Sequence, residues 1–210
     1  MTTMDAAPTT APDEDDRLRA GTWALLAALL RRPPTAELLA QLAAIDTPPA
    51  GEGGALAAAW QDLRAAAAVA DPVALEREYH ALFIGIGRGE LLPFASWYLT
   101  GFLMEKPLGE LRADLARLGF ERQPGVCEPE DHIAALAEVL GLLIGEGSAA
   151  AAGFFAHHIE PWAGRLFADL QTAESACFYR AAGRFAEAFL AFERQYGAMP
   201  ALAPSSVPAG

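Results

Sequence analysis

The sequence has few cysteines, no long apolar run and few basic residues. Its two cysteines, Cys127 and Cys177, are too few for a disulfide framework and lack the spacing of a zinc motif. No apolar run approaches the roughly 20 residues that a membrane-spanning helix needs. Basic residues number 15 against 27 acidic ones, and the formal charge is −12. This balance excludes the electrostatic footprint of a nucleic-acid-binding protein, and it reflects either solubility alone or a cationic partner.

The N-terminal region does not follow the residue order that is typical of an export signal. A secretory signal places positive charge before its apolar stretch and a small-residue cleavage site after it. Here four acidic residues, 13–16, come before the apolar residues 23–30, and Arg31 and Arg32 come after them. Because this order is reversed, we expect the protein to be cytoplasmic and to have no stable membrane insertion.

Apolar residues, in contrast, make up 53% of the chain, and alanine alone supplies 47 of the 210 residues. This content excludes global disorder, and alanine has the highest helix propensity. Since no stretch alternates as a strand, we predict an all-α protein with one globular domain of about nine to ten helices over residues 13–196. Residues 1–12 and 197–210 are expected to be flexible tails. Residues 119–127 are a predicted hinge between subregions 13–118 and 128–196.

Capping residues and prolines predict where the helices begin and end. Asp13 is a candidate N-cap for a first helix that Pro33 and Pro34 terminate. A second helix is expected over residues 35–45, and a third helix is expected to end at about Val69. Ser96 is a candidate cap for a helix over residues 97–105. Four later helices are expected to carry proline in their first turn, at Pro72, Pro107, Pro129 and Pro161. An aromatic stripe on the last helix is interpreted as core.

A glycine-rich segment is the first candidate for chemistry. Residues 85–90 read Gly-Ile-Gly-Arg-Gly-Glu, but they lack the lysine and hydroxyl residue of a phosphate loop and the third glycine of a dinucleotide fingerprint. The segment is explained either as a tight connection between helices or as a place where a ligand approaches the backbone closely. The apolar residues 91–98 that follow are candidates for lining a groove.

Two further segments combine histidines with acids. Residues 127–132 read Cys-Glu-Pro-Glu-Asp-His, and such carboxylates beside a histidine fit a general acid/base site, metal ligands, an arginine anchor, or helix capping with a local ion pair. The adjacent His157 and His158 point in different directions on a helix, unlike the paired histidines of a zincin. The residues alone favour a binding protein over an enzyme. The alternative is a small helical metal-dependent hydrolase that uses Asp131 and His132 with His157 or His158.

Three of these segments together resemble the TorD/DmsD/NarJ family of chaperones for molybdenum-containing oxidoreductases. The shared features are Tyr-x-x-Leu-Phe before the glycine-rich loop, a Pro-aromatic-x-Ser-x-Tyr segment at residues 93–98, and Glu-Pro-x-Asp-His at residues 128–132. The form of residues 82–93 resembles a branch associated with formate dehydrogenases. The resemblance implies a TorD-like fold without enzymatic activity and without a resident metal. It also implies no cofactor other than a weakly bound guanine nucleotide.

The resemblance also implies partners and a binding site. The expected function is to bind the N-terminal leader and the apo form of a molybdoenzyme, assist cofactor insertion and delay export. The partners are this client and cofactor-biosynthesis proteins, and the chaperone is a monomer or a homodimer. The leader would meet carboxylates and an apolar surface. The implied leader-binding residues are Tyr79, Phe83, Leu92, Pro93, Phe94, Ser96, Trp97, Tyr98, Glu128, Pro129, Asp131 and His132.

Overall fold

The chain folds into an all-α domain, as the sequence predicts. The structure is a computed structural model, and it describes residues 11–47, 52–122, 125 and 128–198. Within these residues there are ten α-helices, two π-helical segments and a single isolated β-bridge between Phe94 and His132. In chain order the elements are α1 (Glu14–Arg31), α2 (Ala36–Ala43), α3 (Gly54–Val69), α4 (Pro72–Tyr79), η1 (His80–Ile84), α5 (Ala95–Thr100), α6 (Lys106–Arg117), α7 (Ile133–Gly145), α8 (Ala150–Phe154), η2 (Phe155–Ile159), α9 (Glu160–Thr172) and α10 (Phe178–Ala198).

The predicted tails lie mainly outside the described residues, and the predicted hinge lies partly outside them. Most of both tails and four of the residues in 119–127, Cys127 among them, are not described, so these assignments stay predictions. At the start of the predicted hinge, Gly119 has a φ of +81° directly after the last turn of α6. A glycine adopts this left-handed conformation without the strain that a side chain would introduce. Gly119 therefore ends the helix.

The local start signals of several helices are confirmed. The Asp13 carboxylate accepts a hydrogen bond from the Asp16 N–H at 2.8 Å, and Asp71 accepts one from Ala74 at 2.9 Å. Pro107 lies in the first turn of α6, where a missing N–H costs nothing. These devices act within one turn of the chain, which is why sequence alone is enough to place them.

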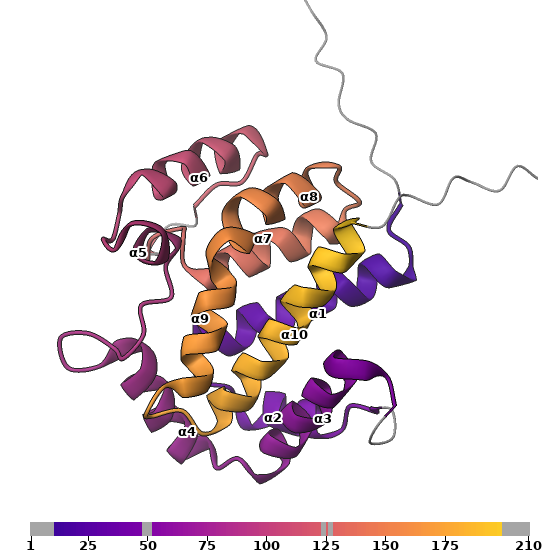
Figure 1. Cartoon of the computed structure of the whole chain (residues 1–210), viewed down its shortest axis with the longest axis vertical. Coiled ribbons are helices and arrows are strands. Elements are labelled where there is room, and N and C mark those ends of the chain that lie inside the picture. Colours follow the sequence, from indigo (N-terminus) through magenta and orange to yellow (C-terminus); the bar gives the residue numbers. More distant parts are fainter. Residues whose placement is uncertain (1–10, 48–51, 123–124, 126–127, 199–210) are drawn as a thin grey trace, which may run out of the picture.

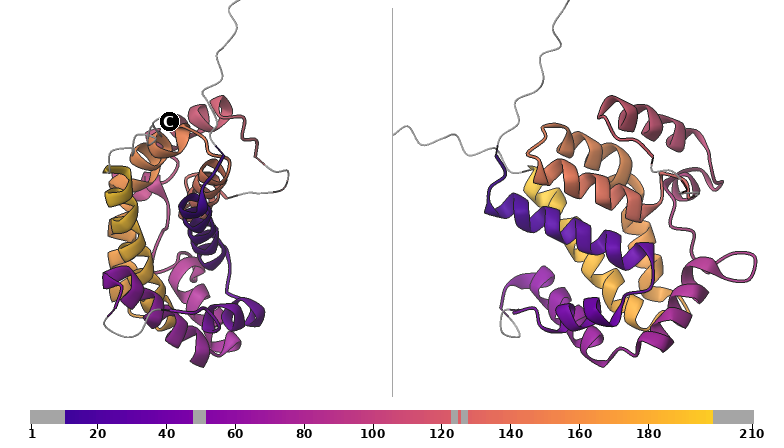
Figure 2. Two further views of the ribbon diagram at one scale, coloured as in Figure 1. Left: turned by 90° about the vertical axis from the view of Figure 1, so that its right-hand side faces the viewer. Right: turned by 180° about the vertical axis from the view of Figure 1, so that it is seen from behind.

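The core lies between two layers of helices. α1 packs along α7, and α10 packs against α9 and α3, so that Figure 2 shows α1 and α10 on different sides of the molecule. Trp23 of α1 contacts Phe189 of α10 across the layers, with ring centroids 5.1 Å apart. The first part of the aromatic stripe of α10 fills this space, which confirms its interpretation as core there: Phe178, Phe185 and Phe189 are buried. Farther along the helix, Phe192 and Tyr196 of the same stripe are only half-buried.

Two predicted helix starts are wrong, and both lie where distant segments meet. Ser96 does not cap a helix over residues 97–105, because α5 begins at Ala95 after Phe94 and ends at Thr100. Pro129 does not open a helix either, since α7 begins at Ile133 with His132 as its N-cap. At Ser96 a tertiary contact with Asp131 has replaced the local cap, whereas at Pro129 the His132 ring caps the helix instead.

The helix α6 lies at the outside of the domain, beside α5 (Figure 1). Leu108 and Leu111 are its buried residues. Farther along the helix, Asp114 accepts a hydrogen bond from Nε2 of the buried His158 of η2 at 2.8 Å. Burial lowers the pKa of His158, although Asp114 opposes this, so the contact is a hydrogen bond from a neutral ring. A peripheral helix held in this way leaves part of its surface available to form one wall of a groove with α7.

Candidate functional site

The two motif segments that the sequence singled out meet at one junction between α5 and α7. The Ala95 N–H donates to the Asp131 carbonyl at 3.0 Å, and the Ile133 N–H donates to the Pro93 carbonyl at 2.9 Å. These bonds join residues 93–96 to residues 131–133. The structure therefore places the predicted apolar segment beside the predicted Glu-Pro-x-Asp-His motif.

Asp131 is the buried centre of this junction. Its side chain is 1% exposed, and Oδ2 accepts hydrogen bonds from the Ser96 N–H at 2.8 Å and the Ser96 hydroxyl at 2.6 Å. Oδ1 has no hydrogen-bond partner within the described part of the chain. In this conformation Asp131 cannot reach a ligand at the surface, so its direct action here is to hold α5 against the turn before α7.

His132 completes the junction as a neutral ring. Its Nδ1 accepts the Ala134 N–H at 3.1 Å and so caps α7, while the ring meets Phe94 edge-on with centroids 5.1 Å apart. Burial, and to a smaller extent the positive charge of Arg31, lower the pKa of His132 to about 4. The ring lies 3.7 Å from a Glu128 carboxylate oxygen, but without a charge it forms no ion pair with it. Glu128 is therefore left without compensation from this side.

The aromatic residues among the predicted site residues lie in two different environments. Tyr79 and Phe83 are buried with Tyr179, and their rings lie 5.0 Å from each other and 6.0 Å and 5.3 Å from the Tyr179 ring. Trp97 and Tyr98 are half-buried. Arg88 of the glycine-rich loop lies over the Trp97 ring at 5.5 Å. The first group thus belongs to the core, and the second borders the surface.

The glycine-rich loop is a tight connection between η1 and α5. A Cβ at Gly85 would lie 1.8 Å from the Arg88 carbonyl oxygen, and one at Gly89 would lie 2.5 Å from the Leu82 carbonyl oxygen. No real side chain tolerates such distances, so both positions require glycine for the backbone to pack on itself. The observed close approach is between parts of this chain.

A larger amphipathic groove lies between α6 and α7. Its volume is about 330 Å³, and its floor is apolar, with Leu142 47% exposed. Side chains of both signs form its rim. The floor consists of Leu115, Ala116, Phe120, Ala135, Leu136, Val139 and Leu142. The rim consists of Arg31, Arg112, Glu121, Arg122, Glu128, Pro129, Glu130 and Glu138.

Most charges on this rim are paired with one another. Arg31 pairs with Glu138, and Arg112 donates to Oε2 of Glu130 from Nε at 3.0 Å and from Nη2 at 2.8 Å. Although partial burial acts to raise it, the Arg112 hydrogen bond lowers the pKa of Glu130 below its usual value. Glu130 is therefore ionised and fixed at neutral pH.

Glu121 and Glu128 are the rim carboxylates outside these pairs. Within the described residues, no lysine or arginine lies within salt-bridge distance of the Glu128 carboxylate, which is 46% exposed. Partial burial raises the pKa of the Glu128 carboxyl, and the charge of Arg31 opposes this shift. A half-buried carboxylate that lacks a cation is well placed to bind one from a ligand.

Sequence reasoning found Glu128 and Pro129 but missed the rest of the groove. The overlooked signal is α7 itself, whose residues Ile133–Gly145 are apolar on all sides except for Glu138. A helix with apolar residues all around has more than one face to cover. One face of α7 packs on α1, and the remaining apolar face forms the groove floor.

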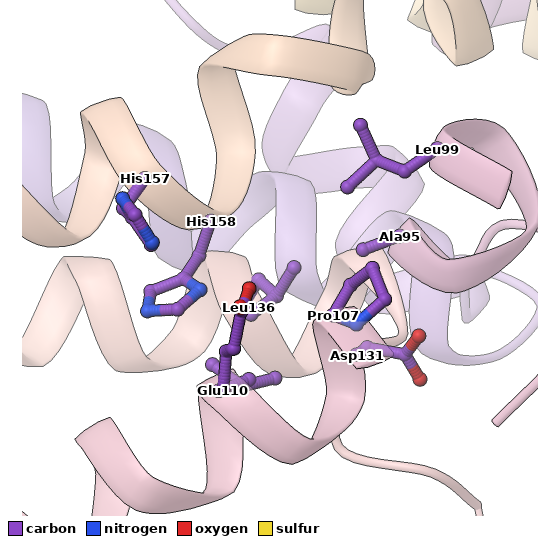
Figure 3. Close-up of a pocket in the computed structure, with 9 residues that line it drawn as sticks. Ala95, Leu99, Pro107, Glu110, Asp131, Leu136, His157 and His158 are labelled. Carbon is purple, nitrogen blue, oxygen red and sulfur yellow. The ribbon is translucent and has the colours of Figure 1, made fainter. Parts of the chain in front are cut away.

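The residues of the alternative metal site do not assemble. Among the described residues, no group of three or more His, Cys, Asp and Glu side chains is placed to hold a metal ion. A small cavity of about 50 Å³ does have His157, His158 and Asp131 in its lining, but Figure 3 shows the two rings at one end and the carboxylate at the other. Asp131 is bonded to Ser96, and His158 to Asp114.

The described residues thus form an all-α domain with an amphipathic groove between α6 and α7. The comparisons identify its class as chaperones of redox enzyme maturation. A sequence model of the nitrate reductase delta subunit family matches residues 50–168, more than half of the chain. The chain belongs to this family, which groups the NarJ/TorD-type chaperones and is non-catalytic.

A solved structure shares this fold. It is a crystal structure from Archaeoglobus fulgidus described as that of a redox enzyme maturation protein. It is 20% identical, has a TM-score of 0.55, and the match covers 83% of this chain and 94% of that one. No curated protein matches the sequence. Among the described residues, no helix is both long and apolar enough to cross a membrane.

Proposed function

We propose that this maturation chaperone is cytoplasmic and binds the N-terminal leader of its apo-molybdoenzyme client in the α6–α7 groove. While bound, it would assist cofactor insertion and delay export. A formate dehydrogenase is the client that the resemblance in residues 82–93 favours. A leader that carries two arginines before an apolar segment has the chemistry that the groove complements.

The observation that carries this proposal is the combination of Glu128 with the apolar floor. Glu128 offers a carboxylate without a cationic partner in the described residues, at the end of a 330 Å³ groove floored by Leu115, Val139 and Leu142. A guanidinium can form charge-assisted bonds with the carboxylate while the adjacent apolar residues cover the floor. The arginines and the apolar segment of such a leader would thus be bound by neighbouring residues of the groove.

The other predicted leader-binding residues act in two ways in this proposal. Tyr79, Phe83, Pro93, Ser96, Asp131 and His132 are buried, and we assign them positioning roles. The Asp131–Ser96 bond and the His132 cap fix the turn that presents Glu128 and Pro129 to the groove. The half-buried residues Leu92, Phe94, Trp97 and Tyr98 are proposed to contact the client beyond its leader.

Titration of a synthetic leader into Glu128→Gln tests the proposal. The probe is a 20-residue peptide with two adjacent arginines followed by an apolar stretch, measured by isothermal titration calorimetry. Loss of the charge-assisted bond is expected to weaken binding by about tenfold. The matched control is Glu76→Gln, which removes the same charge from an exposed position on α4. Equal affinities of the two variants would show that the groove mouth does not bind the leader.

A further inference from the structure

The groove already contains an arginine of the chain itself. Nη2 of Arg122 donates to the Glu128 carbonyl oxygen at 2.7 Å, and Nη1 lies 3.7 Å from Oε1 of Glu130. The Arg122 side chain is 38% exposed. Its guanidinium therefore lies at the rim, between the two acidic residues that form the mouth of the groove.

Arg112 and Arg122 contact Glu130 very differently. Arg112 directs two nitrogens at one carboxylate oxygen, both within hydrogen-bond distance. Arg122 approaches the other oxygen across 3.7 Å, which is too long for a hydrogen bond. Partly exposed ion pairs of this length contribute little to stability. Arg112 thus fixes Glu130 in place, whereas Arg122 can leave without removing the carboxylate's charge compensation.

The position of Arg122 also matches what a ligand guanidinium would need. The Glu128 carbonyl and the Glu130 Oε1 atom both face this one planar fork, and the Glu128 side chain supplies a second carboxylate at the same groove mouth, outside the contacts of Arg122. Guanidinium groups suit such arrangements because their five donors lie in one plane, which an ammonium group cannot reproduce.

We propose that Glu128 and Glu130 form a guanidinium subsite that Arg122 fills in the free protein and that an arginine of the client displaces it. This inference rests on the proposed function of the groove. The incoming arginine gains the Glu128 carboxylate and takes over the contacts that Arg122 releases. Arg122 thereby lowers the affinity of the groove for basic ligands. Ligands whose guanidinium makes more contacts than the Arg122 guanidinium are bound preferentially.

Arg122→Ala tests the displacement with the same two-arginine peptide. Removal of the internal competitor is expected to tighten binding about threefold to fivefold at 0.15 M salt. Arg77→Ala on α4, which lies away from α6 and α7 in Figure 1, removes the same charge and is expected to change affinity by less than twofold. Arg122→Gln keeps a donor for the Glu128 carbonyl and guards against local unfolding. Its binding should also be tighter than that of the wild type.

A direct readout is the Nε–H resonance of Arg122 in an NMR titration of the wild type, which should shift as the peptide binds. Weaker or unchanged binding by both Arg122 variants, with the wild type still binding the peptide, would overturn the subsite and leave the proposed function standing. Binding by Arg122→Ala but not by the wild type would support displacement. If neither the wild type nor these variants bound the peptide, both proposals would be wrong.

Discussion

At the scale of single residues, burial separates the acids that act directly from those that position others. Asp131 is 1% exposed and has both its backbone carbonyl and its Oδ2 committed to the start of α5. Glu128, three residues earlier, is half-exposed and without a cationic partner in the described residues. The motif therefore combines a buried part that fixes the backbone and an exposed part that is available for binding.

His132 should make stability depend on pH. Its pKa is about 4 in the folded protein and near 6.5 when unfolded, so the unfolded chain binds more protons between these values. The contribution is present above pH 6.5 and is lost as pH falls toward 4, amounting to about 2 kcal/mol between pH 7 and pH 5. His132→Asn keeps a capping oxygen but does not titrate. In urea unfolding it should lose about 2 kcal/mol less than the wild type over this range.

The pH effect of other groups is removed by taking this difference between wild type and variant. His158 also has a lowered pKa and is retained in both proteins. If the two proteins lost equal stability from pH 7 to pH 5, His132 would be charged in the folded state, and the account of the junction as a neutral cap would be wrong.

At the scale of elements, two long-range carboxylates fix the start of α10. Glu78 at the end of α4 accepts hydrogen bonds from the N–H groups of Cys177, Phe178 and Tyr179, at 2.7 to 3.2 Å. Glu90 accepts the Ser175 N–H at 3.1 Å and also that of Glu174. The negative charge also suits the positive end of the helix dipole. Residues about one hundred positions away thus replace the local cap.

Glu78→Ala should therefore destabilise the fold through α10. Loss of a charged acceptor for three N–H groups is expected to cost about 1–3 kcal/mol in urea unfolding. Glu76→Ala, two residues earlier and exposed, should change stability by less than about 0.5 kcal/mol. Hydrogen exchange should show the first turn of α10 opening faster in Glu78→Ala. Equal stability of the two variants would mean that the Glu78 cap makes no net contribution to the free energy of unfolding.

The same contrast explains which elements the sequence can predict. Helix starts at Asp13 and Asp71 are predictable because the capping bond closes within three residues. Ser96 and Pro129 carry equally good local signals, but Asp131 binds Ser96 across 35 positions, and after Pro129 the His132 ring caps α7 at Ile133 instead. The groove could not be predicted from the sequence for a related reason. Its two walls come from α6 and α7, and the sequence pattern of either helix alone does not indicate that they pack side by side.

At the scale of the whole molecule, the charge of −12 gains a specific use in this account. It speeds encounter with a basic leader and makes the association sensitive to salt, whereas the final contacts are made in the α6–α7 groove. Other apolar side chains are exposed elsewhere, in particular Phe102 and Met104 between α5 and α6, at 69% and 72%. The binding site of the leader must therefore be located among several exposed apolar surfaces.

Methyl NMR of the full chain with the two-arginine leader peptide locates the binding site most directly. The resonances of Leu115, Val139 and Leu142 are expected to shift during the titration, because these side chains form the groove floor. Those of Val69 and Val73, which are exposed near the junction of α3 and α4, should not move. Shifts confined to Leu103 and Met104, with the groove methyls unchanged, would contradict binding in the groove.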